Sequence, residues 1–261
     1  MYLGVVRAAP QSSLASARLF DPMYARTTES PVLLLGAAHV VDLEQALRSV
    51  LGGRVLDGVA VELDAERAEG LLHPPPGGRQ PAAGLPFVTR LWGVLQKRLG
   101  AEIGAGEAGA EMKVAALVAE ERRLPLFLID DPIRMTVFRL IQTMPFKERV
   151  QLLVGAVIAL FVPSRLVRRE VDRYAAAPEE YADALRAASP TVARVLLDER
   201  NEHMADRLAQ IRAQGYGRVA AVVGDAHLPG LAAALGRRGL PVETIPFSRL
   251  REVTGPTSHP N

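Results

Sequence analysis

Five short apolar segments, each bounded by glycine, proline or aspartate, constrain the fold of this chain more than any other feature. They are Val32–Leu35, Val59–Leu63, Leu126–Ile129, Val219–Val223 and Val242–Ile245. Continuous apolar runs of this length are typical of parallel strands that are buried on both faces. Helical patterns separate them, which favours βαβ units with right-handed crossovers. The sequence therefore predicts an α/β fold with a mainly parallel central sheet flanked by helices.

Two stretches interrupt the alternation of strands and helices. A proline- and glycine-rich stretch near 72–109 predicts a helical excursion over the sheet, and the stretch near 132–213 predicts a helix-rich insertion. A chain of 261 residues with 49% hydrophobic and 23% charged residues has ordinary globular composition and fits one large domain. We expect a single α/β domain over residues 1–261, with an ordered core of about 31–250 and flexible termini.

Two of the apolar segments end in the same pattern, a glycine followed three residues later by a histidine. The first leads into Gly36 and His39, and the second into Gly224 and His227. Glycine permits a sharp turn, which would place each histidine at the carboxyl edge of the sheet. Ligands bind at that edge in open parallel sheets, and imidazole is well suited to proton transfer or metal ligation near neutral pH.

Glu62 is a carboxylate within an otherwise apolar strand. Burying it costs several kcal/mol unless it is paired or bound to a cation. If Val32–Leu35 and Val59–Leu63 are neighbouring parallel strands, His39 and Glu62 lie near the same edge of the sheet. The alternative is an ion pair between Glu62 and an arginine inside the fold.

Two further polar groups accompany predicted helices. Glu199 and His203 are four residues apart and share a helix face, which suits a shared metal or an ion pair, although a solvated face is the alternative. Asp130 follows an apolar strand and belongs at a carboxyl edge. Asp131 precedes Pro132, which predicts a helix N-cap with proline at the first helical position.

Six motifs in this chain, taken together in order and spacing, resemble the TraB family. They are Gly36-Ala37-Ala38-His39, Val61-Glu62-Leu63, Gly109-Ala110-Glu111, Asp130-x-Pro132-Ile133 with Thr136 and Arg139, Glu199-Arg200-Asn201-x-x-Met204, and Gly224-x-x-His227. The resemblance runs from about Val32 to Ile245. It implies a shared α/β fold in which both Gly-x-x-His motifs and a glutamate face one cleft.

The wider group to which this family belongs includes GumN-like, TIKI, ChaN-like and erythromycin-esterase proteins. TIKI members are metal-dependent proteases that prefer manganese or cobalt, and pheromone-shutdown members inactivate or sequester a small peptide. Esterase relatives use the histidine as a general base without a metal, and ChaN-like relatives bind haem. The resemblance thus implies several activities for one cleft.

The chain departs from the family pattern in two respects. The family usually reads Asp-Arg-Pro-Ile, whereas this chain has Asp131 in place of the arginine. This charge inversion at the cleft edge argues against an inherited contact to an anion or a substrate carboxylate. Many pheromone-shutdown and archaeal members also carry C-terminal membrane spans, of which this sequence shows none, so the resemblance implies no membrane role.

These observations predict a metal-dependent hydrolase that acts on a peptide or an amide. His39, His227 and Glu62 would bind a divalent cation and leave positions open for water. Two histidines and a carboxylate suit zinc, manganese or cobalt. The bound metal would activate water and polarise the carbonyl group.

Four other side chains complete the predicted site. The expected roles are proton acceptance by Glu111 or Glu199 and stabilisation of the oxyanion by Arg139 or Arg200. Two alternatives remain open. In one, His39 acts as a general base oriented by Glu62 without a metal. In the other, the protein does not catalyse and sequesters a peptide or haem in the same cleft.

The composition narrows the choice of partners. The net charge is only +2, aromatic residues make up 5%, and no basic face is interleaved with aromatics, so we expect no nucleic-acid binding. The absence of cysteine excludes disulfides, thiolate metal sites and a cysteine nucleophile. The expected partner is a small peptide or another small-molecule substrate.

The location is expected to be cytoplasmic, because the first 31 residues contain no uninterrupted apolar core of a signal peptide. The apolar run Val150–Val162 would cover only about 20 Å as a helix, which is too short to span a bilayer. A buried core helix is the favoured interpretation. An interfacial helix or a homodimer contact is the alternative, and membrane association is not favoured.

Overall fold

A computed structural model describes residues 30–37, 43–73, 109–159 and 178–253 of the chain. These residues contain a five-stranded parallel sheet with the order β3-β2-β4-β1-β5. The strands are β1 (Val32–Ala37), β2 (Gly58–Val61), β3 (Leu126–Leu128), β4 (Val219–Gly224) and β5 (Val242–Ile245). The prediction of an α/β fold around a parallel sheet is confirmed, and each of the five apolar segments forms a strand.

The order of the strands corrects one expectation. The placement of His39 and Glu62 near one edge was made on the condition that β1 and β2 are neighbours, but β4 lies between them and pairs with both, so that Leu33 pairs with Ala220 and Val59 pairs with the same residue. Sequence periodicity identifies strands but does not determine their order. β4 consists only of Val, Ala and Gly, and its side chains are almost fully buried, which suits the central position.

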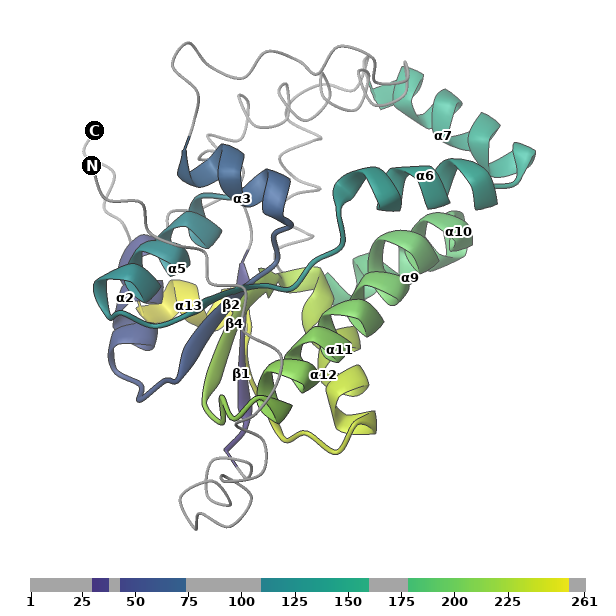
Figure 1. Cartoon of the computed structure of the whole chain (residues 1–261). Helices are drawn as coiled ribbons and strands as arrows, with labels where there is room; N and C mark the ends of the chain where they lie inside the picture. Colours follow the sequence, from purple (N-terminus) through teal and green to yellow (C-terminus); the bar gives the residue numbers. More distant parts are fainter. Residues whose placement is uncertain (1–29, 38–42, 74–108, 160–177, 254–261) are drawn as a thin grey trace, which may run out of the picture.

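Helices cover both faces of the sheet (Figure 1). The regular helices are α2 (Glu44–Gly52), α3 (Ala65–Leu72), α5 (Ala110–Glu121), α6 (Ile133–Thr143), α7 (Phe146–Ala159), α9 (Pro178–Ala188), α10 (Pro190–Ala193), α11 (Glu199–Ala213), α12 (Leu228–Arg237) and α13 (Phe247–Val253). A π-helical turn, η1 (Arg194–Asp198), joins α10 to α11, and a 3₁₀ turn, η2 (Asp225–His227), joins β4 to α12. The predicted helix-rich insertion near 132–213 is confirmed.

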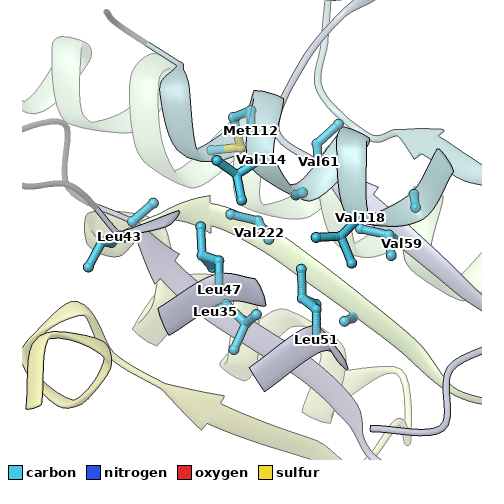
Figure 2. Packing of buried hydrophobic residues seen from close by; sticks show 14 of the residues in the cluster. Leu35, Leu43, Leu47, Leu51, Val59, Val61, Met112, Val114, Val118 and Val222 are labelled. Carbon is cyan, nitrogen blue, oxygen red and sulfur yellow. The ribbon is translucent and has the colours of Figure 1, made fainter. Parts of the chain in front are cut away.

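One face of the sheet packs against α2, α5 and α13. Figure 2 shows Leu47 and Leu51 of α2 and Val118 of α5 meeting over the strands. The strands contribute alternate residues to this layer, including Leu35 of β1 and Val222 of β4. Because successive side chains of a strand point to opposite faces, the intervening residues are left for the second layer.

The second face packs against α11 and α12. Met204, Leu208 and Ile211 form the buried stripe of α11 that the helical spacing predicts. They contact the layer that contains Leu34 of β1 and Val223 of β4. A sheet that is buried on both faces explains why its central strands are continuously apolar rather than alternating.

Parts of the predicted organisation lie outside the described residues. These are residues 74–108 of the excursion and the ends of the chain before residue 30 and after residue 253. The division of the chain into domains stays a prediction.

The sequence analysis favoured a buried core helix for Val150–Val162. The described part of this run, residues 150–159, does not fit that interpretation. In α7, Val150 is 43% exposed and Val154 is 51% exposed, so these positions are not in a core. Residues 160–162 lie outside the described residues. Within the described ranges, no helix is both long enough and apolar enough to cross a bilayer.

Gly36 of β1 is required for a reason other than the predicted turn. A Cβ atom at this position would collide with the carboxylate of Asp225 and would lie 2.7 Å from Cδ1 of Leu228. Asp225 is buried and accepts a hydrogen bond of 2.8 Å from the backbone N–H of Phe247, which fixes the start of α13. Glycine therefore permits the close approach of η2 to β1.

Replacing Gly36 by alanine is expected to lower the free energy of unfolding by about 1–3 kcal/mol, because neither Asp225 nor Leu228 has room to move away. Urea denaturation measures this change. Gly236→Ala is the matched control, since a Cβ there meets no atom within 4 Å and alanine favours the helix α12. The control should be neutral or slightly stabilising. Equal stability of both variants would contradict the packing described here.

Candidate active site at the carboxyl edge of the sheet

Three polar residues follow three neighbouring strands. Glu62 comes directly after β2, Asp130 comes two residues after β3, and His227 ends the turn η2 that follows β4. Since β2 pairs with both β3 and β4, these residues converge at one edge of the sheet. The sequence predicted that Glu62 lies within its strand. In the structure it is the first residue beyond the strand end.

Glu62 is held by contacts from three elements. Its Oε2 accepts a hydrogen bond of 2.6 Å from the backbone N–H of Gly224, and its Oε1 accepts one from the guanidinium group of Arg200. Oε1 also lies 3.4 Å from Nε2 of His227. Burial alone would raise the pKa of Glu62, but His227, Arg200 and the Gly224 N–H together hold this pKa well below its usual range. Glu62 is therefore a charged carboxylate near neutral pH.

Arg200, near the start of α11, links two of the strand ends. Its Nε and Nη2 donate hydrogen bonds of 3.0 and 2.7 Å to the two oxygens of Asp130, while Nη2 also contacts Glu62. Nη1 donates to the carbonyl oxygen of Leu196, which lies in the π-helical turn η1. Burial acts to lower the pKa of Arg200, but the two carboxylates outweigh it and raise the pKa. The guanidinium group is therefore permanently charged and fixed in orientation.

The ion-pair network extends from Asp130 to α3. The Oδ2 of Asp130 also accepts from Arg67, and Arg67 donates through Nε to Asp64 at 2.7 Å. Asp64 is the N-cap of α3 and accepts a hydrogen bond of 2.9 Å from the backbone N–H of Arg67. Burial would raise the pKa of Asp64, but the hydrogen bonds and charge of Arg67 lower it. Helix capping and site assembly therefore depend on the same residues.

His227 is buried, and both of its ring nitrogens have a neighbour. Nδ1 lies 2.8 Å from Oδ1 of Asn201, and Nε2 faces Glu62. Because an amide oxygen can only accept, Nδ1 carries the proton and donates to Asn201. Asn201 in turn packs against Gly230, where a Cβ would collide with its amide nitrogen. This contact fixes the orientation of the Asn201 amide.

Glu199 and His203 do not form the shared pair that their spacing predicts. Glu199 pairs with Arg194 and lies 3.7 Å from Arg139, whereas Nδ1 of His203 lies 3.3 Å from Oδ1 of Asp131. Each of the two side chains thus pairs with a residue from outside its own helix, Glu199 with Arg194 and His203 with Asp131. These contacts form a half-exposed rim beside the buried network.

The prediction that Asp131 caps α6 is also wrong. Pro132 is the N-cap residue of this helix, and Asp131 instead accepts a hydrogen bond of 2.9 Å from Arg139. The backbone N–H of Asp131 donates to Asp130 at 2.9 Å. Asp131, which stands where the family has arginine, is thus neutralised by a neighbouring arginine.

Two predicted site residues are only partly located. Glu111 is buried in the first turn of α5, which leads from the carboxyl edge of the sheet back to β3. His39 lies outside the described residues. The last described residue before it, Ala37, pairs with Gly224, three residues before His227, so the described end of β1 lies beside the end of β4.

Four members of the network were not predicted as site residues, namely Asp64, Arg67, Asp130 and Asn201, although Asp130 was expected at a carboxyl edge. Asp64 and Arg67 carry a local signal, since aspartate directly before a helix is a typical N-cap. Asn201 lies beside Arg200 in a motif that the resemblance already included, but no sequence rule assigns it to His227. Among the described residues, no group of three or more His, Asp and Glu side chains is arranged to hold a metal ion.

The fold and this network define a parallel α/β protein whose buried polar centre lies at the carboxyl edge of the sheet, where such proteins bind ligands. More particularly, the chain belongs to the TraB/PrgY/gumN family, whose family model matches residues 25–244. An uncharacterized protein of Methanocaldococcus jannaschii, MJ1365, is 31% identical over 219 residues. The match covers 78% of this chain and 53% of that protein, so the chain spans about half the length of this relative. No solved structure gives a significant match.

Proposed function

We propose that this protein is a metal-dependent hydrolase that acts on peptides or amides, with Glu62 and His227 at its centre. The observation that carries the proposal is the approach of Nε2 of His227 to Oε1 of Glu62 at 3.4 Å. Since Nδ1 lies against the amide oxygen of Asn201, Nε2 is the ring nitrogen that faces the charged carboxylate of Glu62. Such a contact is stable only when a proton or a metal ion lies between the two atoms.

The spacing of these two atoms fits ligation of one metal ion. Two donor atoms at about 2.1 Å from a tetrahedrally coordinated ion lie about 3.4 Å apart. A histidine that binds a metal through one nitrogen usually donates its other N–H to an outer partner, as His227 does to Asn201. His39 is the proposed third ligand, because its strand ends beside that of His227. Manganese, cobalt and zinc all suit this set of donors.

A bound metal would supply a water molecule of lowered pKa and polarise the substrate carbonyl. The chain's own residues supply the rest. Arg200 is held rigidly by Glu62 and Asp130, so it can stabilise the negative charge that develops on the carbonyl oxygen. Arg139, at the rim, is the second candidate for this role.

Proton acceptance is proposed for Glu111 or Glu199. Glu199 lies at the half-exposed rim, where it pairs with Arg139 and Arg194, and Glu111 lies in the buried first turn of α5. The substrate class is a small peptide or another small amide, because the centre is a compact group of polar residues rather than an extended charged surface.

Metal binding tests the proposal directly. We expect the purified wild-type protein to bind close to one equivalent of Mn²⁺ by calorimetry and elemental analysis, and His227→Ala and His39→Ala to lose this binding. His73→Ala is the matched control, because His73 is exposed at the end of α3, away from the network. Absence of binding to the wild type, with manganese, cobalt and zinc all tested, would disprove metal dependence.

Turnover is tested by digestion of a peptide library with Mn²⁺ and again with a chelator. Cleavage that requires the metal and is lost in His227→Ala supports the proposal. Cleavage that the chelator leaves unchanged would instead favour the general-base alternative. Binding of a peptide or haem without cleavage would favour sequestration.

A further inference from the structure

Exposed apolar side chains are concentrated on α6 and α7. Seven of the eight large apolar residues that are exposed in the described part of the chain lie here, namely Ile133, Met135, Phe138, Ile141, Phe146, Val150 and Val154. Residues three or four apart lie on one side of a helix, so 135, 138 and 141 form one stripe and 146, 150 and 154 form another. Phe146 is 80% exposed and Phe138 is 54% exposed. Single exposed apolar residues are common, but a contiguous group marks a binding surface.

The charges on these two helices have one sign at the surface. Residues 133–159 contain four basic side chains and one acidic side chain, Glu148. Glu148 is buried against α10, where it accepts hydrogen bonds from the backbone N–H and the hydroxyl group of Thr191. Arg134, Lys147 and Arg149 are all exposed; Arg134 also pairs with the exposed Glu66 of α3 at 2.9 Å, and Arg149 donates to the carbonyl oxygens of Ile141 and Met144. The outward surface of α6 and α7 is therefore apolar and basic.

We propose that α6 and α7 bind the surface of an anionic phospholipid bilayer, with the two apolar stripes in the interfacial region and the basic residues among the headgroups. Amphipathic helices with Phe and Leu-like residues on one face and Lys or Arg beside them bind anionic membranes in this way. Glu148 and Thr191 hold α7 to α10 from the opposite side, which leaves the stripes free. Over the described residues α6 has 11 residues and α7 has 14, which is shorter than a bilayer-spanning helix, so the proposed contact is interfacial.

Charge selects this partner over a second copy of the chain. Two copies that meet through these helices would bring two surfaces with an excess of basic side chains together, and like charges at a contact are repulsive. An anionic lipid surface instead complements them. In Figure 1, α6 and α7 lie at the outer edge of the molecule, away from the sheet.

The test is co-sedimentation of the full-length protein with vesicles. We expect binding to vesicles of phosphatidylcholine and phosphatidylglycerol in equal parts, little binding to phosphatidylcholine alone, and weaker binding as salt is added. The double variant Phe138→Ser with Phe146→Ser should bind at least about tenfold more weakly, since it removes two aromatic anchors. The double variant Arg134→Glu with Lys147→Glu should abolish the preference for anionic lipid.

The controls use matched exposed residues elsewhere on the chain. Val55→Ser removes an exposed apolar residue far from α6 and α7, and Arg207→Glu reverses an exposed charge on α11; both should bind as the wild type does. Thermal unfolding should be unchanged in all four variants. Failure of the wild type to bind either vesicle would overturn the proposal. So would a stable dimer in sedimentation that the phenylalanine variant dissociates, because the stripes would then serve a second copy. Neither outcome affects the proposed hydrolase.

Discussion

Replacing Arg200 by methionine is expected to lower the free energy of unfolding by about 3–5 kcal/mol. Arg200 is the one side chain that contacts both Glu62 and Asp130 among the described residues, and both carboxylates are almost inaccessible to water. Methionine keeps much of the length of the side chain but leaves two buried negative charges close together. Urea denaturation at neutral pH measures the change.

An exposed ion pair provides the matched control for this variant. Arg48 pairs with Glu44 and Glu121 on the surface of α2 and α5, so Arg48→Met should leave the urea midpoint nearly unchanged. Arg200→Lys should recover only part of the loss, because an ammonium group cannot donate to both oxygens of Asp130 and to Glu62 in the same geometry. If Arg200→Met were as stable as Arg48→Met, the network would not be part of the folded protein.

Replacing Glu62 by glutamine is expected to abolish metal-dependent hydrolysis. Loss of a ligand should exceed the 10- to 100-fold loss that is typical for outer partners of a metal site. Glutamine has the same shape, but its single amide oxygen can accept from only one of the Gly224 N–H and Arg200, so the variant loses some stability while keeping the fold. The measurement is the rate of peptide cleavage at saturating Mn²⁺. Activity within tenfold of the wild type would remove Glu62 from the proposed centre.

The stability of the Glu62→Gln variant, measured in the presence of a chelator, should differ from that of the wild type in a way that depends on pH. The pKa of Glu62 is lower in the folded protein than in the unfolded chain, so its contribution is fully present above the unfolded value of about 4.3 and is lost as the pH falls towards the folded value. Glu62→Gln lacks this contribution at every pH. Its deficit in stability relative to the wild type should therefore be largest near pH 7 and should shrink below about pH 4.

Local patterns predicted the elements of the fold well because the sheet is buried on both faces. Each central strand had to be apolar throughout, as Leu34 and Leu35 or Val222 and Val223 show. The position of β4 could not be predicted in this way, because strand order depends on how crossovers pack rather than on the composition of any segment. The condition that His39 and Glu62 follow adjacent strands is not met for this reason.

The candidate site was predictable only in part. The convergence of Glu62 and His227 followed from their positions at strand ends, and the alternative of a Glu62–arginine pair also holds, since Arg200 binds Glu62. The contacts of Glu199 and His203 could not be predicted, because their partners come from other helices and turns. A spacing of four residues brings two side chains near each other, but stronger partners from other elements decide which contacts form.

The place of β4 in the middle of the sheet has a consequence for how the protein is made. A ribosome releases β1, β2 and β3 before it synthesises Val219. Until then the pair β2–β3 cannot be joined to β1, because β4 is the strand between them. During that interval the edges of β1 and β2 that pair with β4 in the finished sheet have no strand beside them there. Nascent chains with open strand edges are prone to aggregate and are typical clients of chaperones. Synthesis of β4 is therefore the step at which this sheet becomes a single structure.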